Sequence, residues 1–404
     1  MRIKRKYVTL TVLAALCLGL LWKISFVEVP LLLVAAEASP WRNVNEQLLG
    51  EIAAGRQTLI VLKNWRRAVR KLGLAAGDLI IAEDLTELRR FLRDRPDALA
   101  VIPWYDARPG WRTLRLNGLY FWENQRPYPL VSRCFSWGWL PKYKPRRVKN
   151  ITIGGQVLLA RGVGQVIDRT SDANYPWQGV AGVLRAADLA VVTLQAPLVY
   201  DYVKPRSPEL LYGKARYADG LSYAGIDLVA LSGRSMGDAG VSGIRDTLDI
   251  LGKLNIPHIG LAASPDAAYA PCLFKLNGLR VAFLARRWSG PSKYTETDLR
   301  GVARTYYLPE HSPSDSPGEQ APAADLLILL NNDGADSSVN FWEGGNLADG
   351  ERSKAAPQLG SLIFDQPSGK TGGALQRIFV YGKKVAAVDV LPVFLNDRWY
   401  TEIK

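Results

Sequence analysis

Residues 187–199 read ADLAVVTLQAPLV, and residues 223–260 read YAGIDLVALSGRSMGDAGVSGIRDTLDILGKLNIPHIG. Two short apolar runs, at 189–194 and 227–231, have the length and β-branched content of buried strands. The second run leads into residues 241–254, where apolar side chains recur at helical spacing, and another strand follows. Strand, loop, helix and strand form a βαβ unit, in which sites lie at the carboxyl ends of the strands. We therefore expect a site in the segments TLQAPL and SGRSMGDAG.

Composition limits the class of protein. A chain of 404 residues, 48% hydrophobic and 22% charged, has room for two or three globular domains. Its net charge of +13 suits a polyanionic partner such as nucleic acid, anionic lipid or an acidic surface polymer. The alternative is a solvated basic surface, because the basic residues are scattered outside 1–6 and 142–149. Of the three cysteines, Cys17 lies in an apolar run, and a disulfide between Cys134 and Cys272 stays an open possibility outside the cytoplasm.

The N-terminus has the form of a secretory signal. MRIKRK is followed by an apolar run at 7–22, and apolar character resumes with VPLLLVAAEA at 29–38. The AEA triplet at 36–38 resembles a cleavage site but lies far beyond the first apolar run. We therefore expect an uncleaved signal-anchor within residues 1–38, with the basic end in the cytoplasm. The protein would be a single-pass protein of the cell membrane with its bulk extracytoplasmic, which argues against nucleic acid as a partner.

Two folded regions follow the anchor. Residues 40–145 have short apolar runs at 59–62, 79–82 and 98–102 and predict a small α/β domain. A basic, proline-bearing linker at 141–149 ends this domain.

The larger region covers residues 151–398. Its opening, TIGGQVLLARGVGQVID, predicts a strand, a turn and a helix, and buried strands are expected at 279–285 and 325–330. The polar stretch 289–324 between them is typical of a surface loop. Residues 358–393 predict closing strands, the last two in an antiparallel hairpin.

This larger region resembles the CapA family, the poly-γ-glutamate capsule biosynthesis proteins, whose domain is similar to metallophosphatases. The resemblance rests on GGQVLLARGVG, ADLAVVTLQAPL, DLVALSGRSMGDAG and NIPHIG, followed in the family's order by LRVAFLA, DLLILLNNDG and LGSLIFDQ. It implies an α/β fold, a metallophosphatase-like layered sandwich preceded here by the smaller α/β domain and the anchor. Residues 40–145 resemble a domain that precedes the capsule domain in some longer members, and they could have a solute-binding-protein fold.

The chain departs from the family at the metal-ligand positions. Where the resemblance implies aspartate, glutamate and histidine blocks, this sequence has the neutral or cationic residues Gln156, Thr193, Gln195, Gly233, Arg234, Ser235 and Asn332. A two-metal site needs several carboxylate or imidazole ligands. The only histidines are His258, which begins a strand and is interpreted as structural, and His311, in the polar stretch. We therefore expect no metal, no cofactor and no catalytic residues of the family type.

Three functions remain open. The first is a membrane-anchored CapA-like protein without metallohydrolase activity, which binds or organises an anionic surface polymer or the membrane proteins that synthesise it. Its seven substituted positions would line a cleft that takes a carboxylate or phosphate through Arg234, unless Arg234 only pairs with Asp238. The second is a hydrolase or phosphatase-like enzyme, but no serine has a G-x-S-x-G context. The third is a solute-binding sensor module. An acidic loop at 331–336 could hold Ca²⁺ but does not match EF-hand spacing.

Overall fold

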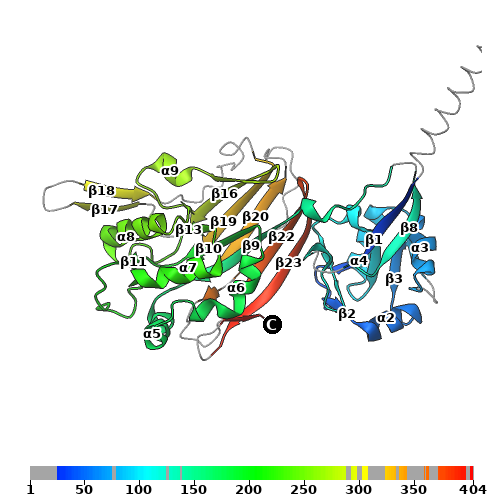
Figure 1. Ribbon diagram of the computed structural model, residues 1–404, viewed down its shortest axis with the longest axis horizontal. Helices are drawn as coiled ribbons and strands as arrows, with labels where there is room; N and C mark the ends of the chain where they lie inside the picture. The colour runs from blue at the N-terminus through cyan, green and yellow to red at the C-terminus, as the bar shows by residue number, and fades with distance from the viewer. Residues whose placement is uncertain are drawn as a thin grey trace, which may run out of the picture. The chain divides into compact units, whose positions relative to one another are not determined.

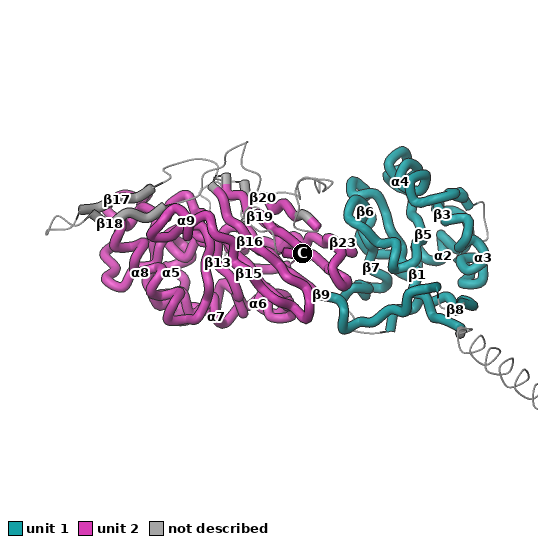
Figure 2. The backbone as a smooth tube through the Cα atoms, turned by 90° about the horizontal axis from the view of Figure 1, so that it is seen from above, with its two compact units in different colours: residues 1–148 teal, residues 149–404 magenta. Residues whose placement is uncertain are grey.

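The computed structural model describes residues 25–74, 79–123, 127–136, 139–287, 293–297, 303–307, 324–333, 336–343, 359, 361–363, 372–396 and 401–403 (Figure 1). The chain divides into two compact units, residues 1–148 and 149–404 (Figure 2).

The first unit contains a mixed sheet in the order β4-β3-β5-β1-β6, with β8 also paired to β1. The strands of this unit are β1 (Ser25–Ala36), β2 (Asn43–Val44), β3 (Leu59–Leu62), β4 (Ile80–Ala82), β5 (Leu99–Pro103), β6 (Trp111–Thr113), β7 (Arg115–Leu116) and β8 (Val131–Ser136). Strands β2 and β7 pair with each other in a separate two-stranded sheet. Its α-helices are α2 (Glu46–Ala53), α3 (Arg66–Lys71) and α4 (Leu85–Asp94). Helix α4 begins where the Asp84 carboxylate accepts a hydrogen bond from the Glu87 amide at 2.8 Å, and it buries Leu88 and Leu92 at a spacing of four.

Strand β1 is the centre of this unit. It pairs antiparallel with β5, β6 and β8. Five consecutive side chains of β1 have no exposed surface: Leu31, Leu32, Leu33, Val34 and Ala35. From the sequence we predicted that this apolar stretch belongs to the anchor segment 1–38 and that the first domain begins at residue 40. That boundary needs correction, because residues 25–36 belong to the folded unit.

The predicted membrane run at 7–22 lies outside the described residues. No helix within the described part of the chain has the length and apolarity needed to cross a membrane. The proposed anchor therefore stays a prediction.

The second unit contains a large sheet and a smaller one. The large sheet has the order β14-β13-β10-β9-β22-β23-β24, with β21 also paired to β9, and the smaller has the order β15-β16-β19-β20. The strands of the large sheet are β9 (Val148–Val157), β10 (Leu189–Leu194), β13 (Leu228–Ala230), β14 (His258–Ile259), β21 (Ser361–Ile363), β22 (Gly372–Tyr381), β23 (Lys384–Leu395) and β24 (Thr401–Ile403). Those of the smaller sheet are β15 (Cys272–Leu276), β16 (Leu279–Arg287), β19 (Leu326–Asp333) and β20 (Asp336–Glu343).

The two sheets and a set of helices form layers. The helices are α5 (Arg161–Thr170), α6 (Gln178–Arg185), α7 (Asp219–Ala224), α8 (Gly240–Lys253) and α9 (Pro265–Tyr269). Figure 1 shows α6, α7 and α8 against one face of the large sheet, where Val192 of β10 packs with Ile244 and Leu251 of α8 in one core. The next residue back, Val191, packs with Phe283 of the smaller sheet in a second core. Side chains that alternate along β10 thus fill two cores on opposite faces of the large sheet.

The predicted βαβ unit is present. Strands β9, β10, β13 and β14 are parallel, so their carboxyl ends lie at one edge of the large sheet. The predicted hairpin of β22 and β23 is also present and antiparallel.

The prediction of a surface loop at 289–324 was wrong in part. Within it, β17 (Lys293–Thr297) and β18 (Ala303–Tyr307) pair antiparallel, and the rest of this stretch lies almost entirely outside the described residues. The alternation KYTET and ARTYY has β character that the surrounding proline and serine residues obscure. Two short strands, β11 (Leu198–Val199) and β12 (Gly213–Lys214), form a further parallel pair.

An ion-pair cluster joins β16, β19 and the β22–β23 turn. The Asp325 carboxylate is 3.2 Å from the Arg280 guanidinium and 3.0 Å from the Lys383 ammonium group. The hydrogen bond from Arg280 holds the pKa of Asp325 well below its usual range. Asp325 is only 9% exposed, so its charge depends on these partners.

Candidate functional site

Polar residues gather at the carboxyl ends of the parallel strands. Gln156 lies near the end of β9, Gln195 directly follows β10, and Ser232 closely follows β13. Asn332 lies near the end of β19 in the smaller sheet. All four are at most 3% exposed. Buried polar groups of this kind require hydrogen-bond partners or a bound ligand to offset the loss of water.

Two hydrogen bonds connect the two sheets at this edge. The amide Nε2 of Gln156 donates to Oδ1 of Asn332 at 3.2 Å. The amide Nδ2 of Asn332 donates in turn to the backbone carbonyl of Ser232 at 2.9 Å. Asn332 therefore joins the ends of β9 and β13 through one side chain, although it is 176 residues from Gln156.

A tight turn after β13 packs against the end of β10. The Arg234 amide donates to Oε1 of Gln195 at 3.2 Å, and the Ser235 amide donates to the Gln195 carbonyl at 3.0 Å. Gly233 allows this approach, because a Cβ there would lie 2.2 Å from the carbonyl oxygen of Leu194. The turn leaves the Arg234 side chain exposed at the surface.

Two buried donors at this turn lack hydrogen-bond partners among the described residues. They are Nε2 of Gln195 and the hydroxyl of Ser232. Ser232 leads into the turn that carries Arg234, and Gln195 lies at the end of β10, which this turn contacts. Leaving a buried donor unsatisfied costs about 1–3 kcal/mol, which a bound acceptor would recover.

The structure brings most of the predicted set together at this edge. Gln156 and Thr193 face each other in the β9–β10 register, and Gln156 contacts Asn332 directly. Arg234 is exposed at the surface beside the buried amides. Asp238, its suggested partner, accepts a hydrogen bond from the Leu211 amide at 2.9 Å.

Ser232 was missed by the sequence reasoning. The signal that could have found it is its position, since it lies between the end of β13 and the glycine of the turn. Parallel strands place such residues at the edge where sites form.

The residues at this edge do not fit a two-metal centre. The side chains that hold one another here are neutral amides, which supply neither a bridging carboxylate nor imidazole nitrogen. Within the described ranges no group of three or more His, Cys, Asp or Glu side chains is placed to hold a metal ion. His258 begins β14, and burial lowers its imidazole pKa. In the suggested Ca²⁺ loop, Asp333 and Asp336 are cross-strand partners of β19 and β20, and residues 334 and 335 lie outside the described part.

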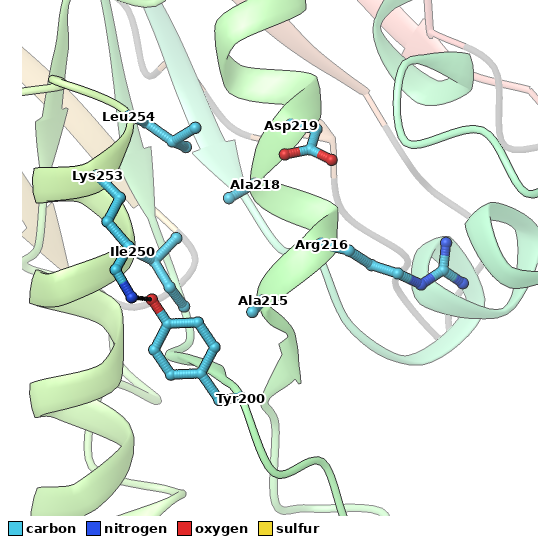
Figure 3. A pocket seen from close by; sticks show the side chains of 8 residues that line it. All are labelled: Tyr200, Ala215, Arg216, Ala218, Asp219, Ile250, Lys253 and Leu254. Atoms are coloured by element: carbon cyan, nitrogen blue, oxygen red, sulfur yellow. Dashed lines mark hydrogen bonds between the residues drawn. The ribbon is translucent and has the colours of Figure 1, made fainter.

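A separate hollow of about 220 Å³ lies on the helical side. Figure 3 shows it between α8 and the start of α7, lined by Tyr200, Ala215, Arg216, Ala218, Asp219, Ile250, Lys253 and Leu254. The Lys253 ammonium group donates to the Tyr200 hydroxyl at 2.9 Å and lies 2.8 Å from the Asp249 carboxylate. The Lys253, Tyr200 and Asp249 side chains therefore pair with one another beside this hollow.

The fold and the site thus define a layered α/β domain with a polar edge at the carboxyl ends of its parallel strands. Residues 150–338 match a sequence model of the family described as bacterial capsule synthesis protein PGA_cap. The match lies within the second unit and confirms the resemblance of this region to the CapA family.

Other comparisons add little. Two solved structures are similar to part of the chain: an ABC-type phosphate transport receptor from Vibrio cholerae (12% identity) and a protein from Clostridium perfringens described as a phosphate ABC transporter substrate-binding protein with bound phosphate (11% identity). Each match has a TM-score of 0.24 and covers 28% of this chain and 58% of the other chain. At that score neither supports an argument about fold or function. Comparison with curated proteins gave no match.

Proposed function

We propose that this protein is a membrane-anchored, extracytoplasmic member of the capsule-synthesis family that binds an anionic surface polymer of the poly-γ-glutamate type without hydrolysing it. The family match supports a role connected with capsule synthesis. The net charge of +13 favours binding to a polyanion. The apolar run at 7–22 supports attachment to the membrane.

One observation carries the binding part of this proposal. The buried Nε2 of Gln195 and the hydroxyl of Ser232 lack partners among the described residues. Ser232 leads into the turn that presents Arg234, and Gln195 lies at the end of β10, against which this turn packs. A polymer carboxylate would accept hydrogen bonds from both donors and pair with the guanidinium. Guanidinium and carboxylate groups match in charge and in planar geometry. A glutamate polymer repeats this carboxylate, so several adjacent units would have access to the turn.

The same residues argue against metal-assisted hydrolysis. The amides of Gln156 and Asn332 hydrogen-bond to each other and to the Ser232 carbonyl at the positions where the CapA resemblance implies metal ligands. An amide cannot replace a bridging carboxylate between two divalent cations. We therefore propose that the domain retains the binding edge of the family and uses it without a metal.

Polymer binding is tested with the full-length chain in detergent micelles and fluorescent poly-γ-glutamate. Arg234→Gln should weaken binding about 2- to 5-fold, the effect of removing one exposed ion pair. The control is Arg169→Gln, because Arg169 is also exposed but lies in the last turn of α5, away from the carboxyl edge. Binding should weaken as salt rises from about 0.05 to 0.5 M, since salt screens exposed charges. Equal losses in the two variants would reject a role for this turn.

Metal content is a separate test. Elemental mass spectrometry of the full-length protein, dialysed without chelator, should find far less than one equivalent of Mn, Fe or Zn per chain. One or two equivalents, together with release of glutamate from the polymer, would contradict the proposal of binding without hydrolysis.

A further inference from the structure

The first unit exposes an aromatic surface at one end of β1. Phe26 is 63% exposed, Phe135 is 53% exposed and Trp139 is 87% exposed. Phe26 and Phe135 are direct cross-strand partners in the β1–β8 ladder, and their rings meet edge to face with centroids 5.8 Å apart. We call these three side chains the aromatic end. They comprise all the large hydrophobic side chains found exposed among the described residues of this unit.

Trp139 belongs to the same end of the ladder. Strand β8 ends at Ser136, which pairs with Ser25, the first residue of β1. The Ser136 hydroxyl accepts a hydrogen bond from the Leu140 amide at 3.2 Å, which holds the segment containing Trp139 next to the strand end. The three aromatic side chains therefore lie where the chain enters the folded unit.

Next to the aromatic end, the exposed face of the β1–β8 ladder carries charged side chains. Two residues further along the exposed face, Glu28 and Arg133 are cross-strand partners, and both are exposed. The Arg133 guanidinium lies 5.5 Å from the Phe26 ring centroid, a cation–π contact. Aromatic side chains at one end with charged side chains next to them are typical of a protein surface that lies in the interface of a membrane.

The sequence before β1 indicates what covers this surface. The apolar run 7–22 is separated from Ser25 by two residues. If that run spans the membrane, the chain from residue 22 to Ser25 can reach at most roughly 10 Å beyond its outer end. This is the depth of the headgroup region, where Trp and other aromatic side chains are enriched.

We propose that Phe26, Phe135 and Trp139 insert into the headgroup region of the membrane and fix the orientation of the first unit on it. This inference rests on the proposed membrane anchor. The first unit would then be attached at two points, the anchor and the aromatic end, so it could not rotate freely about the chain at Ser25.

The test uses the full-length protein, reconstituted into phosphatidylcholine and phosphatidylglycerol vesicles. Cys17, Cys134 and Cys272 are replaced by serine, and a single cysteine at position 139 (Trp139→Cys) carries an NBD fluorophore. The matched control is Glu37→Cys, an exposed position just beyond the far end of β1. Eleven residues of strand separate Phe26 from Glu37, or roughly 36 Å. Circular dichroism confirms that both labelled proteins are folded.

Lipids brominated near the headgroup should quench the label at 139 several-fold more than the label at 37. Weak quenching at both positions, or equal quenching, would overturn the aromatic end as a membrane contact. An alkaline carbonate wash distinguishes the two proposals. If the protein stays with the vesicles while label 139 is not quenched, the anchor stands and this inference fails. If the wash removes the protein, the anchor itself is rejected, and this inference with it.

Discussion

The turn after β13 can be tested through the glycine that it requires. A Cβ at position 233 would lie 2.2 Å from the Leu194 carbonyl oxygen and 2.4 Å from the Gln195 Cα. Both are backbone atoms, so no side-chain rotation relieves the contact. Gly233→Ala must therefore separate the turn from the end of β10. The hydrogen bond from the Arg234 amide to Gln195 Oε1 should lengthen or break.

The expected cost follows from this geometry. Inserting one methyl group into a well-packed core costs about 1–3 kcal/mol, and contact with backbone atoms puts this case at the upper end. For 150–250 residues each kcal/mol lowers the melting temperature by about 2–4 °C. The second unit of the Gly233→Ala protein should therefore melt roughly 5–10 °C lower, on the same scale. Binding to poly-γ-glutamate should fall as well, because the turn presents Arg234.

Calorimetry of the full-length protein gives the melting temperature, and hydrogen exchange of peptides from β10 and β13 assigns the change to this edge. The control is Gly252→Ala, because a Cβ at Gly252 has nothing within 4 Å, and this residue lies inside α8. That substitution should stabilise the protein by about 0.5–1 kcal/mol. A Gly233→Ala protein that melts with the parent and exchanges at the same rate in β10 would refute the reasoning.

Three further substitutions test the second unit. Burial lowers the pKa of His258, so as pH falls below about 6.5 the unfolded chain binds a proton before the folded chain does. The free energy of unfolding should therefore drop between pH 7 and 5. His258→Gln should remove this pH-dependent drop, as measured by urea titrations. The Asp325 pKa is lowered, so its contribution to stability is fully present above about pH 4 and is lost progressively as pH falls from there through the lowered pKa of the folded state. Asp325→Asn should cost about 1–3 kcal/mol at pH 7 and progressively less below about pH 4. Gln376 is fully buried, and both its amide atoms lack partners among the described residues; Gln376→Met should stabilise by about 1–2 kcal/mol, and a loss of stability would reveal a partner for the amide.

Much of the second unit could be predicted from apolar patterns. The apolar pattern identifies the strands at 189–194 and 227–231 and the helix that follows them. Each of these segments keeps the pattern of a strand or of a helix over its whole length, so its type is clear from the sequence. Strand β1 was assigned to the anchor instead, since a strand buried on both faces is as continuously apolar as a membrane segment. Strands β17 and β18 were missed because proline and serine residues on either side suggest a loop.

The candidate site depended on the family resemblance. Spacing alone cannot show that Gln156 and Asn332 meet across 176 residues, because each pattern describes only its own strand. The order of the family's blocks supplied that juxtaposition. The exposed position of the Arg234 side chain could not be predicted, since it follows from the close packing of Gly233 on β10.

The central position of β1 has a consequence for how the protein is made. This strand is the first of its sheet to leave the ribosome, but its partners β5, β6 and β8 span residues 99–136. At about 5–20 residues per second, β1 waits some seconds for its neighbours. During that time a largely apolar strand has both edges open, which favours aggregation or capture by a chaperone. Cleavage after the AEA triplet at 36–38 would remove this strand, so any processing compatible with this fold must occur before Ser25.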